Sequence, residues 1–207
     1  MPGGLNFVFK GLIVGFVIAA PAGPIGVLCA RRALMYGRRA GFFSGMGAAA
    51  ADAFYGFIAA FGLTFVSDFL VGHQFWIRLA GGVLLILLGT KTLITEPRGK
   101  RDLPKSAKKF AGMFTSTFFL TLTNPMTIFS FAAVFAGFGL AGIKGSATSA
   151  GILVSGVFLG SALWWLLLVG IFTLFKRRFK HHELQWVNRI AGVIIAGSGA
   201  MALLSLR

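Results

Sequence analysis

Hydrophobic residues make up 57% and charged residues only 12% of this 207-residue chain, whereas soluble domains average about 45–50% and about 25%. So little polar surface cannot cover a water-soluble globule, which excludes a soluble enzyme and a disordered chain and leaves an integral membrane protein. The formal net charge of +15 would indicate nucleic acid in a soluble protein. Here the basic residues occur in short runs between apolar blocks, as in the loops of membrane proteins, so we expect no nucleic-acid partner.

Six apolar blocks are long enough to cross a bilayer core of ~30 Å, for which a helix needs about 20 residues. The first block has no basic region before it of the kind that begins a cleavable signal peptide, so we expect it to stay in the mature protein. The short connections leave no room for a soluble domain, and the sequence predicts one all-α integral membrane transporter domain over residues 1–207. In chain order the blocks are residues 7–30, 40–66, 75–95, 111–140, 149–175 and 186–206.

Basic residues alternate between the connections, and this alternation predicts the orientation. Fourteen of the 20 Lys and Arg residues fall in three of the five connections, whereas the other two carry one. Because basic loops stay in the cytoplasm, we expect both termini outside, with Arg31 and Arg32 in the first cytoplasmic loop. The basic segments are 31–39, 96–109 and 176–180, and the other two connections are 67–74 and 141–148.

Prolines interrupt the first and the fourth apolar block. The first contains Pro21-Ala22-Gly23-Pro24 and the fourth contains Asn124-Pro125, and a proline removes a backbone donor and clashes with the preceding turn. A single proline can be a simple kink, but here the broken block comes first in each half of three spans. An odd number of spans inserts the two halves in opposite orientations, and paired broken helices of this kind indicate a transport site. We predict two inverted three-helix repeats with broken helices 1 and 4, in residues 1–95 and 110–207, joined by a cytoplasmic loop, 96–109.

The two breaks are predicted to form the binding site. We expect new helices to begin near Gly26, after the first break, and near Thr127, after the second. The start of a helix exposes unpaired N–H groups and a partial positive charge, and inverted halves can aim both starts at one cavity, where they would hold a substrate carboxylate. The predicted substrate-binding residues are Pro21, Gly23, Pro24, Gly26, Asp52, Asn124, Pro125 and Thr127.

Asp52 is the acidic residue that lies within a predicted span rather than in a loop or at a span end. It follows Arg39 by 13 residues, which is about 20 Å along a helix and places it near the middle of the membrane. Burying an acid there costs about 2.5–3.5 kcal/mol on translocon scales, and the spans offer no obvious basic partner in sequence. Three interpretations stay open: Asp52 binds a substrate ammonium group, carries a proton, or is held by hydrogen bonds to a neighbouring helix.

Glycine and hydroxyl residues add two further patterns. Glycines recur at four-residue spacing, which lets helices approach closely in lipid and predicts a compact bundle. Hydroxyl side chains precede the second break, where they either line a polar path or bond back to their own helix carbonyls. The glycine pairs are Gly11 and Gly15, Gly41 and Gly45, and Gly156 and Gly160, and the hydroxyl residues are Thr115, Ser116, Thr117, Thr121 and Thr123.

Four motifs occur in a recognisable order: Pro21-Ala22-Gly23-Pro24, Gly37-Arg38-Arg39-Ala40-Gly41, the glycine-rich stretch from Gly45 to Asp52, and Asn124-Pro125. In order and spacing, over the whole chain, they resemble the LysE/RhtB family of bacterial amino-acid exporters. The chain departs from the family pattern where Ala22 interrupts the usual Pro-Gly-Pro and where Met126 stands in place of a common Lys. The resemblance implies a small inner-membrane protein that exports amino acids or related metabolites and is driven by the proton gradient.

The sequence therefore predicts a secondary transporter, not an enzyme, that exports a small amino acid or derivative across the bacterial inner membrane by proton antiport. The alternative is an exporter of a metal ion or another small metabolite, although one membrane acid makes a poor metal site. A membrane thiol–disulfide carrier needs two cysteines, and Cys29 is the one cysteine. We expect no cofactor and no bound metal. The expected partners are the substrate and the bilayer, and a homodimer is left open.

Overall fold

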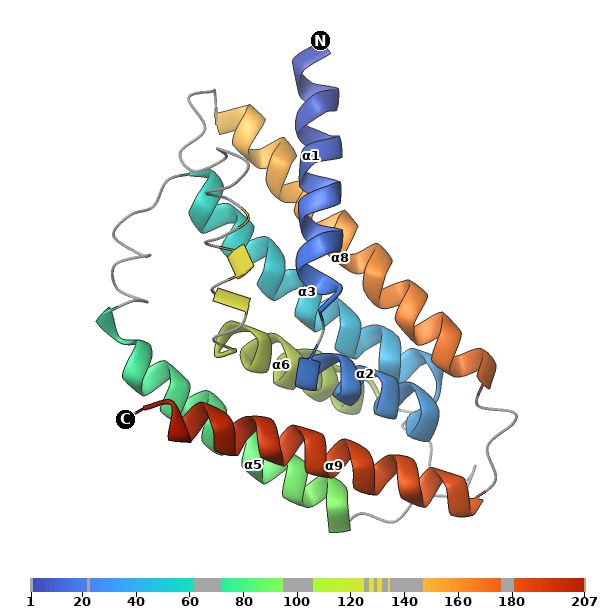
Figure 1. Ribbon diagram of the computed structural model, residues 1–207. Helices are drawn as coiled ribbons and strands as arrows, with labels where there is room; N and C mark the ends of the chain where they lie inside the picture. The colour runs from blue at the N-terminus through green and yellow to red at the C-terminus, as the bar shows by residue number, and fades with distance from the viewer. Residues whose placement is uncertain are drawn as a thin grey trace.

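The computed structural model describes residues 2–21, 23–61, 72–94, 106–124, 127–128, 130–131, 134, 147–175 and 181–206. Within these residues the chain is helical with short turns, and no strand occurs (Figure 1). The named helices are α1 Pro2–Ala19, α2 Gly23–Tyr36, α3 Arg38–Ala60, α5 Gln74–Ile94, α6 Ala107–Leu122, α8 Ala147–Phe175 and α9 His181–Leu204.

Four of the described helices, α3, α5, α8 and α9, are long and apolar enough to cross a membrane. Helices α1 and α2 add a fifth candidate span if they count as one span bent by 85°. For the described residues, the prediction of a helical protein with several membrane-span candidates is therefore confirmed. The full six-span topology and the inverted repeat stay predictions, because the fourth predicted span, 111–140, extends beyond the continuously described residues.

Glycines bring α1 and α8 into close contact. A Cβ atom on Gly11 would lie 2.9 Å from Cα of Gly156, and one on Gly156 would lie 3.0 Å from Cα of Gly11. One turn further along, Gly15 and Gly160 face the backbone of the opposite helix in the same way. The prediction that these small residues pack helices together is confirmed for α1 and α8.

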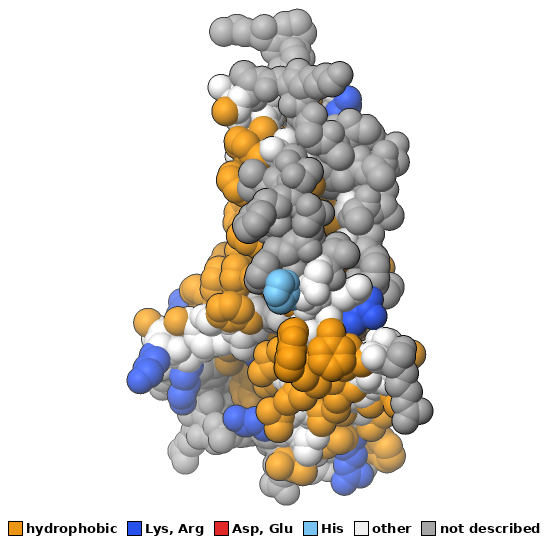
Figure 2. All heavy atoms as spheres, turned by 90° about the vertical axis from the view of Figure 1, so that its left-hand side faces the viewer, with side chains coloured by type: hydrophobic (Ala, Val, Ile, Leu, Met, Phe, Trp, Pro, Cys, Tyr) orange, Lys and Arg blue, Asp and Glu red, His pale blue; other side chains and the backbone are white. Residues whose placement is uncertain are grey.

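Helices α5 and α9 form a second close pair and run side by side along the lower edge of the bundle (Figure 1). Gly89 of α5 packs on Ala196 of α9, and Gly82 packs on Leu203 and the carbonyl of Gly199. Their outward faces carry large apolar side chains, including exposed Phe75 and Leu87. Figure 2 shows such apolar side chains gathered over the lower part of one face of the molecule, as lipid contact requires.

Helix α3 occupies the centre, packed against α8, α6 and α2. Its glycines and alanines let the large residues of other helices approach, and Trp165 of α8 lies on Gly45 while Val169 lies on Gly41. The side chains of Ala48, Ala49 and Ala51 are fully buried there. Asp52 therefore lies on a helix that is closely packed on several sides, and its side chain is buried.

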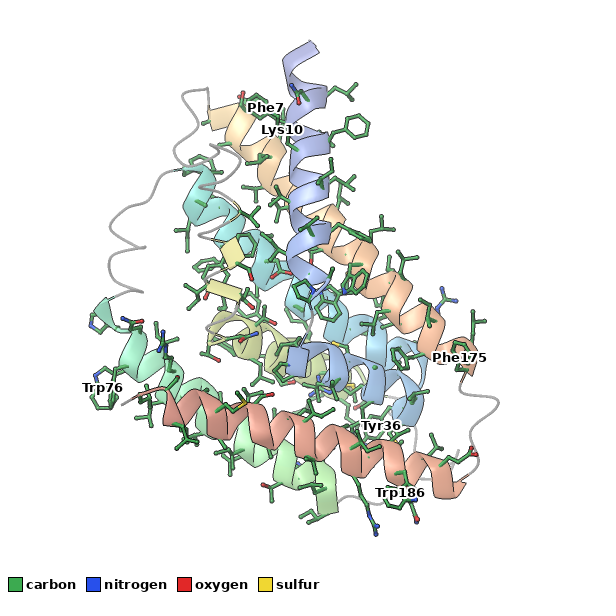
Figure 3. All side chains as sticks on the ribbon, viewed as in Figure 1. Phe7, Lys10, Tyr36, Trp76, Phe175 and Trp186 are labelled. Carbon is green, nitrogen blue, oxygen red and sulfur yellow. The ribbon has the colours of Figure 1, made fainter. Side chains whose placement is uncertain are left out.

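Aromatic residues near the helix ends lie on opposite sides of the bundle. Figure 3 shows Tyr36, Phe175 and Trp186, which end α2, end α8 and begin α9, at one end, whereas Trp76 lies at the other. Residues within or beside two of the three basic segments thus lie on the same side. Which side faces the cytoplasm stays a prediction.

One prediction about the first loop is wrong. Arg31 and Arg32 lie inside α2 rather than in a loop, and their side chains are only 6% and 7% exposed. Because α2 begins at Gly23, three residues before the predicted start at Gly26, and runs to Tyr36, it takes both arginines into the bundle. The turn that leads to α3 is Gly37, whose φ of +90° is a conformation that favours glycine.

Candidate functional site

The first break separates α1 from α2. Helix α1 ends at Ala19, and α2 begins at Gly23, where φ is +43°. A residue with a side chain rarely adopts this backbone conformation, so glycine is required for the turn. Pro24 follows in the first turn of α2, where its missing N–H costs no helical hydrogen bond.

The second break follows α6. The carbonyl of Asn124 accepts hydrogen bonds from the N–H groups of Thr127 at 3.1 Å and Ile128 at 3.3 Å, so a helical turn restarts at Thr127 as predicted. The Tyr55 hydroxyl of α3 donates to the carbonyl of Leu122 at 2.5 Å. A carbonyl freed by the break is thereby satisfied inside the bundle, as a membrane interior demands. Pro125 lies outside the described residues.

A small polar cavity lies where the two breaks meet. Four predicted site residues line it: Pro21 from the first break, Asp52 from α3, and Asn124 and Thr127 from the second break. Its volume is about 40 Å³, and a water needs ~10–15 Å³ on this measure, so it holds about three waters and no amino acid. The remaining lining residues are Ile18, Ala19, Ile25, Thr121, Ser130 and Trp165.

Asp52 is held in the wall of this cavity by neutral hydrogen-bond donors. Its side chain is 3% exposed, and the hydroxyl of Ser161 on α8 donates to Oδ2 at 2.6 Å. The Trp165 indole N–H donates in turn to the Ser161 oxygen at 3.1 Å. This chain fixes the carboxyl group without an ion pair among the described residues, so the group can respond to a cation or proton that enters the cavity.

The remaining predicted residues lie elsewhere. Gly23 and Gly26 line an apolar groove on the other side of the first break, and Pro24 lines neither space. The prediction that both helix starts face one cavity therefore fits the second break but not Gly23 and Gly26. Residues on different faces of a helix point in different directions, and Gly23 and Gly26 lie on the face of α2 that points away from the cavity.

Sequence reasoning missed Ser161 and Trp165. The sequence does contain a pattern that indicates Ser161: it follows Gly156 by five residues, as Asp52 follows Gly47. The hydroxyl residues of α6 fit both interpretations given above. Thr121 bonds to the carbonyl of Thr117 and also lines the cavity.

Arg32 forms a buried polar cluster between α2, α3 and α6. Its guanidinium donates to the Ser44 hydroxyl at 3.0 Å and to the Thr117 hydroxyl and the Met113 carbonyl, both at 2.9 Å. The other terminal nitrogen donates to the Ser116 hydroxyl at 2.9 Å. All four acceptors are neutral, so the cluster holds a buried cation by hydrogen bonds and ties the second part of the first broken span to α6.

Arg31 forms a second such link. Its Nε donates to the side-chain oxygen of Asn188 on α9, and the Asn188 amide donates to the carbonyl of Thr92 on α5 at 2.8 Å. The guanidinium also lies 5.8 Å from the ring centre of Tyr36. The side chain of Asn188, 2% exposed, therefore joins α2 to the α5–α9 pair.

Broken helices that meet at a buried polar cavity within an apolar helical bundle are an arrangement that is typical of membrane transporters. The chain matches the family described as LysE type translocator over residues 16–206, and it belongs to that family. It is 27% identical over 197 residues to the "Putative amino acid efflux protein YcgF" of Bacillus subtilis (strain 168), covering 91% of each chain. It is also 27% identical over 190 residues to the "Uncharacterized membrane protein YrhP" of the same organism, covering 86% of this chain and 90% of that one. No solved structure matches the chain.

Proposed function

We propose that this protein exports a small amino acid or amino-acid derivative across the bacterial inner membrane in exchange for protons. The observation that carries the proposal is the buried carboxyl group of Asp52 in the wall of the cavity where the two helix breaks meet. Such a carboxyl group can bind either an ammonium group or a proton and can exchange one for the other. Membership of a translocator family and similarity to a protein named for amino acid efflux support this choice.

The lining of the cavity suits both ends of an amino acid. Asp52 provides the negative partner for the ammonium group, whereas Asn124, Thr127 and Ser130 provide neutral polar groups for the carboxylate. The present volume holds only waters, so binding requires the breaks to move apart. In this mechanism Asp52 carries a proton inward after the substrate has left, which couples export to the gradient.

The helix packing supports the inverted repeat that this proposal contains. If α1, α3 and α5 correspond to α6, α8 and α9, a two-fold axis exchanges the α1–α8 pair with the α3–α6 pair. The same axis carries the α3–α8 pair and the α5–α9 pair onto themselves. These four pairs make the most extensive contacts between the described helices.

The glycine contacts follow the same relation. Gly47 of α3 packs on the backbone of α6 at Phe114, and Gly156 of α8 packs on the backbone of α1 at Gly11. Asp52 and Ser161 each follow their glycine by five residues. They therefore occupy equivalent positions in the two halves, and their hydrogen bond joins the halves where the axis would pass.

Reconstituted protein in liposomes tests the proposal. Wild-type protein should catalyse counterflow of an amino acid, measured with a radiolabelled panel, and a pH gradient should drive net movement. The variant Asp52→Asn keeps the size of the side chain but removes its charge, and should lose at least tenfold in gradient-driven transport, equivalent to about 1.4 kcal/mol. Asp52→Glu should keep part of the activity, and Glu183→Gln, which removes an acid outside the cavity, should behave as wild type.

Two assays separate the roles of Asp52. If it carries only the proton, Asp52→Asn should keep counterflow and lose gradient-driven transport; if it also binds the ammonium group, both should fall. Full gradient-driven transport by Asp52→Asn would refute either role. Counterflow of Cd²⁺, with none of any amino acid, would establish the metal-ion alternative.

A further inference from the structure

An apolar groove lies directly behind the polar cavity. It runs between one face of α2, the Trp164 side of α8, and α9, and we call it the α2–α8–α9 groove. Its volume is about 430 Å³, and a cavity of about 150 Å³ already accommodates benzene. Gly23, Gly26 and Ala30 leave space on this face of α2, beside its larger groove residues Val27, Arg31 and Leu34.

The first helix break lies between the groove and the cavity. Along this segment Ala19 and Pro21 line the cavity, whereas Ala20 and Gly23 line the groove. Helix α8 makes the same division, since Trp165 faces the cavity and its neighbour Trp164 faces the groove. A movement of the break that enlarges the cavity would therefore join the two spaces.

We propose that the α2–α8–α9 groove receives the apolar side chain of the exported amino acid while its ammonium group binds at Asp52. The substrates are then amino acids with a branched aliphatic or aromatic side chain. This inference rests on the proposed function and names its substrate class. Arg31 also lines the groove, and its hydrogen bond to Asn188 joins α2 to α9 there.

Competition for counterflow in proteoliposomes tests the substrate class. The concentrations of leucine and phenylalanine that half-saturate counterflow should be at least tenfold lower than those of glycine, serine or lysine. Equal half-saturation across this panel would overturn the inference and leave the proposed export of amino acids standing. Absence of counterflow for every amino acid would overturn both.

A pair of matched variants tests the groove itself. Val27→Trp fills the groove from α2, whereas Val193→Trp makes the same change on the lipid-facing side of α9, where the valine is 61% exposed. Val27→Trp should raise the half-saturating concentration of leucine at least tenfold and leave that of glycine within twofold. Val193→Trp should change neither.

One further result bears on the occupant. If Val27→Trp instead releases co-purified phospholipid and leaves leucine counterflow as in wild type, a lipid occupies the groove and the inference is wrong.

Discussion

Gly160 on α8 offers a sharp test of how closely the helices pack. A Cβ atom added there would lie 2.8 Å from the carbonyl carbon of Leu12 and 2.9 Å from its Cα. These atoms belong to the backbone of α1 and cannot rotate away, so Gly160→Ala must push α1 and α8 apart. Gly170 on the same helix has no atom within 4 Å of such a Cβ, apart from its own helix and chain neighbours, which makes Gly170→Ala a matched control.

The size of the effect follows from two opposing terms. Overpacking a well-packed interior costs about 1–3 kcal/mol, and a clash with backbone belongs at the upper end of that range. Replacing glycine by alanine within a helix stabilises the helix by up to about 1 kcal/mol. We therefore expect Gly160→Ala to lower the free energy of unfolding by about 2 kcal/mol and Gly170→Ala to leave it unchanged or raise it by up to about 1 kcal/mol.

Unfolding of the detergent-solubilised protein, followed by tryptophan fluorescence over a denaturant titration, measures both variants against wild type. The comparison between two Gly→Ala changes on one helix removes the contribution of helix propensity. A Gly160→Ala protein as stable as Gly170→Ala would refute the close contact between α1 and α8.

Two more predictions concern orientation and the buried arginines. In a Cys29→Ala background, a cysteine at Lys144 should react with an impermeant thiol reagent in intact cells, and one at Ser106 should react only after the membrane is opened; labelling of position 106 in intact cells would contradict the orientation. Arg32→Lys keeps the charge but not the four hydrogen bonds of the planar guanidinium, and should lower the free energy of unfolding by about 2 kcal/mol or more. The exposed Arg38→Lys is its control, and equal stability of the two variants would show that the hydrogen bonds contribute little.

The positions of the helix breaks and of Asp52 could be predicted because their signals are local. A proline interrupts a helix wherever the helix lies, and a lone acid in an apolar block is costly in any arrangement. The structure accordingly brings Pro21, Asp52, Asn124 and Thr127 to one cavity.

The direction of α2 after its break could not be predicted, because packing against α8 and α9 sets it. Gly23 and Gly26 consequently face the groove, although they belong to the same motif as Pro21. The assignment of Arg31 and Arg32 to a loop failed for a related reason. A count of charges between apolar blocks cannot show that distant helices provide hydrogen-bond acceptors for a buried arginine.

The hydrogen-bond acceptors of Arg31 and Arg32 also constrain the order in which the helices can assemble during synthesis. Ser44 emerges 12 residues after Arg32, but Thr117 follows it by 85 residues, and Asn188 follows Arg31 by 157. A buried arginine in a membrane is costly, and Thr117 and Asn188 do not exist until α6 and α9 have been synthesised. We therefore expect α2 to reach its final position only after α6 and α9 have entered the bundle.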